Sequence, residues 1–227
     1  MLEKNLDFLS KLCKNNNREW FEEHRDEYEA SQEELLAFAD DMIQQIQAFD
    51  PAIGEQTPKN TIFRIYRDIR FSNDKTPYKK ARGVFIKRGG KKSPYASYYI
   101  HIEPGASFAG GGIYHPRKAA LDAVRNKIYF EYETFFNIVN HPRFKKRFGS
   151  VSTDEKLKRM PKGYDEGHPA EYYLKFKSFI IGAPVPDHEM KGSRLAATLA
   201  ELLRPAQPFI HFINEAVEEA GENEKSF

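Results

Sequence analysis

The sequence predicts a single α+β domain over residues 1–227, with an antiparallel sheet of about four strands between residues 61 and 113. Three observations support this fold class. Apolar residues recur at helical spacing through residues 1–50, apolar and polar residues alternate in short runs within residues 59–113, and residues 116–220 are again mainly helical in pattern. Helices from both ends of the chain are therefore expected to flank the sheet.

The first fifty residues are expected to form helices. Leucines recur at every third position from residue 6 to residue 12, which places them on one face of a short helix. Asn17 is suited to cap the start of a second helical stretch that continues to about Phe49. A break in this stretch is expected near Ser31.

Four short strands are expected in the middle of the chain, at residues 61–66, 83–88, 97–103 and 107–113. Phe63 and Ile65 are expected to face inward from the first of them. Turn residues such as Gly89-Gly90 and Pro104-Gly105 separate the last three strands. Short connections between successive strands favour antiparallel pairing.

The dipeptide His-Pro occurs three times, at residues 115–116, 141–142 and 168–169, and each copy precedes a helix-like segment. Proline is favoured at the first helical position because its missing N–H would have no partner there. These histidines are therefore interpreted as helix-entry residues, in preference to three ligands of one metal ion. Two further amphipathic helices are expected at residues 190–203 and 205–220.

Composition favours a cytoplasmic protein. Hydrophobic residues make up 40% of the chain and aromatic residues 14%, which is sufficient for a core. No apolar run approaches the ~18 residues that a membrane span requires, and the first residues lack a secretory pattern. Cys13 is the single cysteine, which is typical of a reducing compartment.

Charge is distributed very unevenly along the chain. Residues 59–102 contain twelve Lys or Arg and two acids, a local net charge of +10, whereas residues 1–58 have a net charge of −9. The remainder contributes +1, so the near-neutral total of +2 conceals a strong partition. The densest basic tract runs from Arg64 to Arg82. Guanidinium groups bind oxyanions through paired hydrogen bonds, so this tract predicts a site for a phosphate or carboxylate.

Within the predicted site, arginines and lysines would fix the anion, Tyr78 would orient it, and two aspartates would hold the arginines in place. A structural alternative stays open, in which the acidic helical segment neutralises the basic tract. Aromatic residues among the charges favour the binding site. The predicted ligand-binding residues are Arg64, Arg67, Asp68, Arg70, Ser72, Asp74, Lys75, Tyr78, Lys79 and Tyr99.

The expected third strand supplies the candidate catalytic residues. Alternation along a strand places Tyr99, His101 and Glu103 on one face. His101 and Glu103 could then act as a general acid–base pair, with a polar strand face as the structural alternative. The run Gly110-Gly111-Gly112 matches no nucleotide-binding motif, so close approach of backbones is favoured over a phosphate cradle.

Two segments resemble a known family. One is the Trp-Phe segment within residues 17–28, and the other is the signature Arg-Asp-x-Arg-Phe-Ser-x-Asp-Lys-x-Pro-Tyr-Lys at residues 67–79. A similar later element is His168-Pro169 followed by residues 174–179. The chain resembles, over nearly its whole length, an uncharacterised, mainly bacterial family of conserved hypothetical proteins, a domain of unknown function. The resemblance implies one domain and brings no reaction with it.

The function that the sequence favours is binding of a small anionic ligand at the Arg67–Lys79 loop, with chemistry on that ligand as an extension. A structural or partner-binding module, in which the loop is a folding element, is the first alternative. Nucleic-acid binding through the basic and aromatic residues is the second. No metal-binding motif is present, and the sequence indicates no cofactor, substrate, reaction or oligomeric state.

Overall fold

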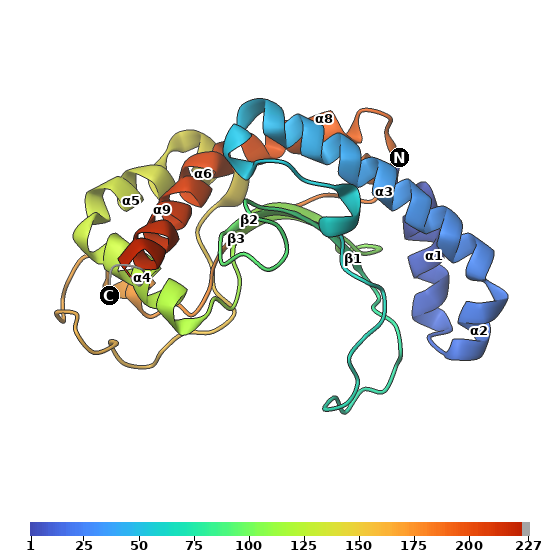
Figure 1. Ribbon diagram of the computed structural model, residues 1–227, viewed down its shortest axis with the longest axis horizontal. Coiled ribbons are helices and arrows are strands. Elements are labelled where there is room, and N and C mark those ends of the chain that lie inside the picture. Colours follow the sequence, from blue (N-terminus) through green and yellow to red (C-terminus); the bar gives the residue numbers. More distant parts are fainter. Residues whose placement is uncertain (224–227) are drawn as a thin grey trace. The chain divides into compact units, whose positions relative to one another are not determined.

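The computed structural model describes residues 1–223 and contains four strands and a series of helices (Figure 1). The strands β1 (Arg82–Ile86), β2 (Ser97–Ile102), β3 (Phe108–Ile113) and β4 (Phe179–Pro184) are hydrogen-bonded in this order. The prediction of a single α+β domain, with a four-stranded antiparallel sheet and helices from both ends of the chain, is confirmed. Of the predicted span 1–227, residues 224–227 lie outside the described residues.

Contacts group the residues into two compact units. The first contains residues 1–86, 99–109 and 184–202, and the second contains residues 87–98, 110–183 and 203–227. The first unit includes α1 (Glu3–Lys14), α2 (Arg18–Glu23), α3 (Arg25–Phe49), η1 (Pro51–Ile53), η2 (Pro58–Asn60), η3 (Glu189–Lys191) and most of α8 (Leu195–Leu203). The second includes α4 (Lys118–Phe130), α5 (Tyr132–Asn140), α6 (Pro142–Phe148), α7 (Glu171–Leu174), η4 (Arg204–Ala206) and α9 (Gln207–Asn223).

In the first unit, α1 packs against the long helix α3, and both bury an apolar stripe. Leucines of α1 and residues such as Leu35, Phe38 and Met42 of α3 are fully buried, which follows from their helical spacing. Asn17 caps α2 as predicted, because its side chain accepts a hydrogen bond from the Trp20 backbone N–H. The predicted break near Ser31 is wrong, since α3 is continuous there and the interruption falls at His24.

The predicted strand at residues 61–66 is not a strand of the sheet. It forms isolated bridges, Ile62 with Val84 and Tyr66 with Tyr78, and the fourth strand is instead β4. Thr61, Ile62 and Ile65 are buried, whereas Phe63 is 37% exposed, so burial does not alternate along the segment. The predicted inward position is correct for Ile65 and wrong for Phe63. After this segment, residues 64–79 form an irregular arm that projects from the start of β1 (Figure 1).

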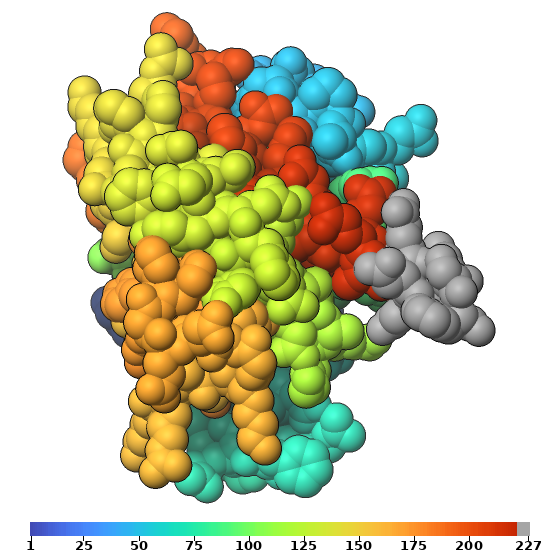
Figure 2. Space-filling view, turned by 90° about the vertical axis from the view of Figure 1, so that its left-hand side faces the viewer, coloured from blue at the N-terminus to red at the C-terminus, as the bar shows by residue number. Residues whose placement is uncertain are grey.

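In the second unit, α4 and α9 lie side by side, as Figure 2 shows for the yellow-green and red segments. Phenylalanines form much of the core, among them Phe209, whose ring contacts the rings of Phe135 and Phe144. Lys127 is buried, and its Nζ lies 2.8 Å from Glu131 and 3.1 Å from Glu219. A buried ammonium group is tolerated there because several carboxylates surround it.

The three His-Pro dipeptides precede α4, α6 and α7. The His141 ring accepts a hydrogen bond from the Arg143 N–H, and the His168 ring accepts one from the Ala170 N–H. Helix entry therefore accounts for His141 and His168, as predicted. His115 differs, because Arg117 and not His115 stands at the N-cap of α4, and His115 Nε2 lies 2.6 Å from Asp154 Oδ2. Within residues 1–223, no cluster of His, Cys, Asp and Glu has the geometry of a metal site, and no helix is long and apolar enough to cross a membrane.

The glycines of β3 permit close packing of strands, which agrees with the favoured interpretation of the Gly110–Gly112 run. A Cβ atom at Gly110 would overlap the backbone oxygen of Ile181 and lie 2.7 Å from the Cα of Gly182. Side chains other than hydrogen therefore do not fit at this position without displacing β4.

Replacing Gly110 by alanine should lower the free energy of unfolding by about 2 kcal/mol or more, because backbone atoms of β4 would have to move. Urea denaturation followed by circular dichroism measures this change. The matched control is Gly192→Ala, at a position with no atom within 4 Å of the added Cβ and ordinary extended dihedrals. The control should stay within about 1 kcal/mol of the wild type, and equal losses in both variants would contradict the packing explanation.

Candidate functional site

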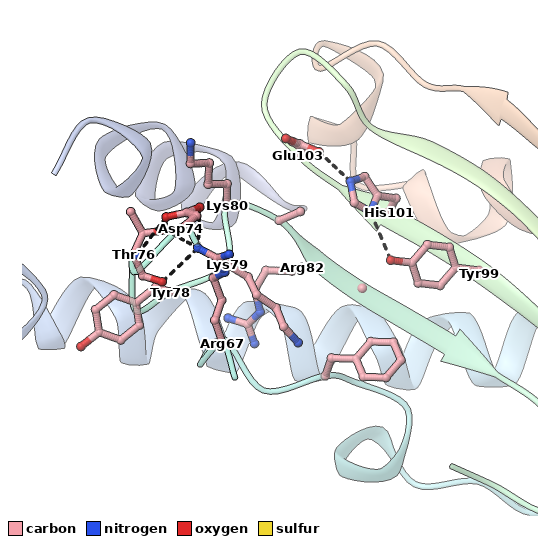
Figure 3. A pocket seen from close by; sticks show the side chains of 13 residues that line it. Arg67, Asp74, Thr76, Tyr78, Lys79, Lys80, Arg82, Tyr99, His101 and Glu103 are labelled. Atoms are coloured by element: carbon pink, nitrogen blue, oxygen red, sulfur yellow. Dashed lines mark hydrogen bonds and ion pairs between the residues drawn. The ribbon is translucent and has the colours of Figure 1, made fainter. Parts of the chain in front are cut away.

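A cavity of about 500 Å³ lies in the first unit, between the segment from Phe63 to Gly83 and the strand β2 (Figure 3). Seven of the predicted site residues line it: Arg67, Asp74, Tyr78, Lys79, Tyr99, His101 and Glu103. The basic tract and the β2 face, predicted from separate parts of the sequence, therefore meet at one cavity. Six other lining residues were not among the predicted site residues: Phe63, Thr76, Lys80, Ala81, Arg82 and Gly83.

Five predicted ligand-binding residues do not line the cavity: Arg64, Asp68, Arg70, Ser72 and Lys75. Arg70 forms a two-point ion pair with Asp68, at 2.9 and 2.6 Å, and both side chains are largely exposed. Lys75 Nζ donates to the Ile69 carbonyl at 3.1 Å. These contacts are local to the projecting arm. This part of the basic tract therefore does not converge with the rest on the cavity.

Arg67 lines the cavity, but its guanidinium is engaged within the arm. Its Nη1 donates to Asp74 Oδ2 at 2.6 Å and to the Thr76 carbonyl at 3.0 Å, and it also contacts the Thr76 hydroxyl. Asp74 accepts further hydrogen bonds from the Thr76 N–H and hydroxyl. Hydrogen bonds from Thr76, with the one from Arg67, lower the pKa of Asp74 to about 2. The pair thus remains ionised at neutral pH and joins residues 67 and 74 within the arm.

Tyr78 has a structural position that differs from its predicted role in orienting a ligand. Its side chain is buried, and its ring is stacked on Phe21 with centroids 4.0 Å apart. Its backbone N–H and carbonyl both bond to the Asn16 side chain, at 3.1 and 3.0 Å. Tyr78 therefore anchors the arm to the start of α2, and burial raises the pKa of its hydroxyl.

Arg82, the first residue of β1, has the most unusual environment of the lining residues. Only 3% of its surface is exposed. Its Nη2 donates to Gln32 Oε1 at 2.5 Å, and the guanidinium lies 5.8 Å from the Tyr28 ring centroid. Its Nε and Nη1 have no hydrogen-bond partner, and no carboxylate among residues 1–223 forms an ion pair with it. Burial lowers the pKa of this guanidinium because water no longer solvates the charge.

One signal for Arg82 was present in the sequence, but the predicted strand boundaries concealed it. The predicted strand began at Gly83, whereas β1 begins at Arg82 and every one of its residues is buried. An arginine inside such a run is rare, because arginine is almost never fully buried without a partner. Its position relative to α3 could not be read from the sequence.

Tyr99, His101 and Glu103 share one face of β2, as alternation predicts, and form a hydrogen-bonded row (Figure 3). Tyr99 Oη lies 3.1 Å from His101 Nδ1, and His101 Nε2 lies 2.7 Å from Glu103 Oε2. Burial and the charge of Glu103 raise the pKa of Tyr99. The predicted acid–base pair is thus in contact, with the tyrosine as a third member.

Two neighbours fix the geometry of this row. The Phe108 ring is stacked on His101, with centroids 4.8 Å apart and an interplanar angle of 20°. A Cβ atom at Gly83 would lie 2.7 Å from Tyr99 Oη, so glycine at this position of β1 makes room for the phenol. The ring positions are therefore set by packing from β1 and β3.

The fold and the cavity define an α+β protein with a cationic cavity beside a Tyr-His-Glu row. No curated protein and no solved structure is significantly similar to the chain. Residues 4–212 match the model of a family of conserved hypothetical proteins, DUF2461. Because the match covers most of the chain, the protein belongs to this family, which confirms the resemblance seen in the sequence.

Replacing Asp74 by asparagine should lower the melting temperature at neutral pH, because Arg67 loses its ionised partner. The folded pKa of Asp74, about 2, lies below its ordinary value, so the carboxylate stabilises the folded state above about pH 4. This contribution is lost as the pH falls through about 2. Thermal unfolding should show a difference in melting temperature between the wild type and Asp74→Asn that is constant above pH 4 and shrinks toward pH 2. A difference that does not change with pH would contradict the assignment.

Proposed function

We propose that this protein binds a small anionic molecule, bearing a carboxylate or a phosphate group, in the cavity lined by Arg82. The observation that carries the proposal is the buried guanidinium with two donor atoms that lack partners. Unpaired buried charges destabilise a fold by several kcal/mol, and natural proteins usually pair them. An anion in the cavity would supply the missing partner.

The charge balance of the cavity supports an anionic ligand. Its lining includes the bases Arg67, Lys79, Lys80 and Arg82 and the acids Asp74 and Glu103. Four bases therefore stand against two acids in the lining, and one of these acids, Asp74, is paired with Arg67. Lys79 Nζ lies 5.4 Å from the centroid of the Phe63 ring, so an apolar wall is next to an ammonium group. This combination suits a ligand with an anionic end and a small apolar body.

The size of the cavity indicates a metabolite and not a polymer. A volume of about 500 Å³ is within the range of small-molecule sites in proteins. The lone cysteine, which is exposed, is consistent with a protein that acts in the cytoplasm. The contact between His101 and Glu103 at the same cavity favours proton transfer on the bound molecule.

The alternative of a folding element applies to part of the basic tract. The bonds among Arg67, Asp74 and Thr76, and those between Asn16 and Tyr78, hold the arm in place and need no ligand. Arg82 has no such network. We therefore divide the tract into residues that shape the arm and residues that receive the ligand.

Replacing Arg82 by methionine should abolish anion binding without damaging the fold. Methionine has a similar length and removes a buried charge, so stability in anion-free buffer should be unchanged or higher by about 1–3 kcal/mol. Binding of inorganic phosphate and of small carboxylates, measured by calorimetry and by thermal shift, should weaken at least about tenfold.

The matched control is Arg70→Ala, which removes an exposed guanidinium outside the cavity and should leave anion binding unchanged. The proposal fails if phosphate and carboxylates do not stabilise the wild type. It also fails if Arg82→Met unfolds in anion-free buffer, because Arg82 would then be a structural residue satisfied within the protein.

The nucleic-acid alternative would use the tip of the arm, where Phe71 is 97% exposed beside Arg70. Residues 1–58 carry a net charge of −9, which would repel a polyanion. We therefore expect no retention of single-stranded DNA on a column even at low salt. Retention that falls steeply with salt, and that Phe71→Ala with Arg70→Ala abolishes, would favour this alternative instead.

A further inference from the structure

We infer that the Tyr99 hydroxyl is the group that exchanges a proton with the bound molecule, and that His101 and Glu103 act behind it. The inference rests on the proposed function, because it assumes that the cavity holds an anionic molecule. It changes the roles expected from the sequence, where His101 and Glu103 were the catalytic residues and Tyr99 a binding residue. On this view Tyr99 is the catalytic residue, His101 accepts its proton, and Glu103 positions His101.

The first argument is that His101 has no nitrogen left for a substrate. Its Nε2 lies 2.7 Å from Glu103 Oε2, and its Nδ1 lies 3.1 Å from Tyr99 Oη. An imidazole has two ring nitrogens, and each bonds to one partner here. A substrate could reach either nitrogen only after one of these hydrogen bonds had broken.

The second argument concerns the direction of the hydrogen bonds. An ionised carboxylate only accepts hydrogen bonds, so His101 donates its Nε2–H to Glu103. In the neutral imidazole, Nδ1 then carries the lone pair and accepts the hydroxyl proton of Tyr99. The Tyr99 O–H bond therefore points toward His101, and the oxygen lone pairs remain for another donor. Because Tyr99 lines the cavity, that donor can be the bound molecule.

The third argument is that neighbouring residues hold the phenol and the imidazole in place. Gly83 leaves space for Tyr99 Oη, and Phe108 stacks on His101. The backbone N–H of Glu103 donates to Ser107 Oγ at 3.0 Å, and this hydroxyl in turn donates to the Glu103 carbonyl at 2.9 Å. A hydrogen-bonded row with such packing is prearranged for proton transfer and does not depend on ligand binding to form.

The proton transfer balances without a cofactor or a second reactant. An acidic X–H bond of the anion breaks, its electron pair stays on X, and its proton forms a new O–H bond at Tyr99. The original hydroxyl proton of Tyr99 moves to His101 Nδ1, and the imidazolium is paired with Glu103. Lys79, Lys80 and Arg82 on the cavity wall would stabilise the added negative charge. Return of the proton to the same or a neighbouring atom completes an exchange or an isomerisation.

The experiment uses the ligand-free protein, so that it does not depend on anion binding. First, nitrogen-15 NMR of protein labelled at histidine determines the tautomer of His101, with His101→Phe for assignment. We expect protonated Nε2 and unprotonated Nδ1 at neutral pH, with the Nδ1 resonance shifted in Tyr99→Phe, which removes its donor. A His101 that carries its proton on Nδ1 would overturn the inference.

Second, the rate of acylation of Tyr99 by N-acetylimidazole is followed by peptide mass spectrometry, with the exposed Tyr114 as internal reference. We expect the ratio of Tyr99 to Tyr114 acylation to fall at least fivefold in His101→Phe, which keeps a ring against Phe108. Glu103→Gln, which keeps the size of the side chain without its charge, should give a smaller fall. Equal ratios in the wild type and in folded Glu103→Gln and His101→Phe would overturn the inference.

The two proposals fail in distinguishable ways. Phosphate binding measured on Arg82→Met addresses the anion site alone, and Tyr99→Phe should retain phosphate binding within about twofold. If the protein binds anions normally but the acylation ratio of Tyr99 does not depend on His101, the proton-transfer inference is removed and the proposed function stays in place. If the acylation ratio of Tyr99 depends on His101 but the protein binds no anion, the proposed function is removed and, with it, the anionic substrate class.

Discussion

The burial of the Arg82 guanidinium imposes the strongest physical constraint on the first unit. A cation removed from water destabilises the folded state unless nearby groups compensate it. Gln32 accepts one hydrogen bond, and the Tyr28 ring contributes about 0.5–2 kcal/mol of cation–π attraction. These contacts leave Nε and Nη1 unsatisfied. The proposed anionic ligand would complete these hydrogen bonds.

The other charges near the cavity are arranged so that they do not cancel Arg82. Asp74 is the acid of the arm that lines the cavity, and it is already bonded to Arg67 and Thr76. Asp68 is paired with Arg70 on the exposed part of the arm. Glu103 accepts a hydrogen bond from His101. Each of these three acids therefore has a defined partner, and none of the three pairs includes Arg82.

Local patterns in the sequence predicted what depends on neighbouring residues. Helical spacing predicted α1 and α3, and strand alternation placed Tyr99 and His101 on one face, where the structure joins them. The partner of β3 could not be predicted, because β4 begins at Phe179, far along the chain. The pairing of the two aspartates of the tract with its arginines was expected from their place among the bases. Which aspartate pairs with which arginine depends on the conformation of an irregular arm and could not be predicted. Burial of Arg82 required the position of α3, which no local pattern encodes.

The start of β1 connects the two proposals. Arg82 supplies the buried charge, and the next residue, Gly83, supplies the space for the Tyr99 hydroxyl. This part of the strand is held from the other side by residues 61–63, because the Phe85 N–H donates to the Thr61 carbonyl at 2.8 Å and the Phe63 N–H donates to Gly83. Residues 61–63, which were expected to belong to a full strand, thus fix the start of β1 by two backbone hydrogen bonds. Because the start of β1 positions both Arg82 and the Tyr99 hydroxyl, a shift of β1 would alter the proposed anion binding and the proposed proton transfer together.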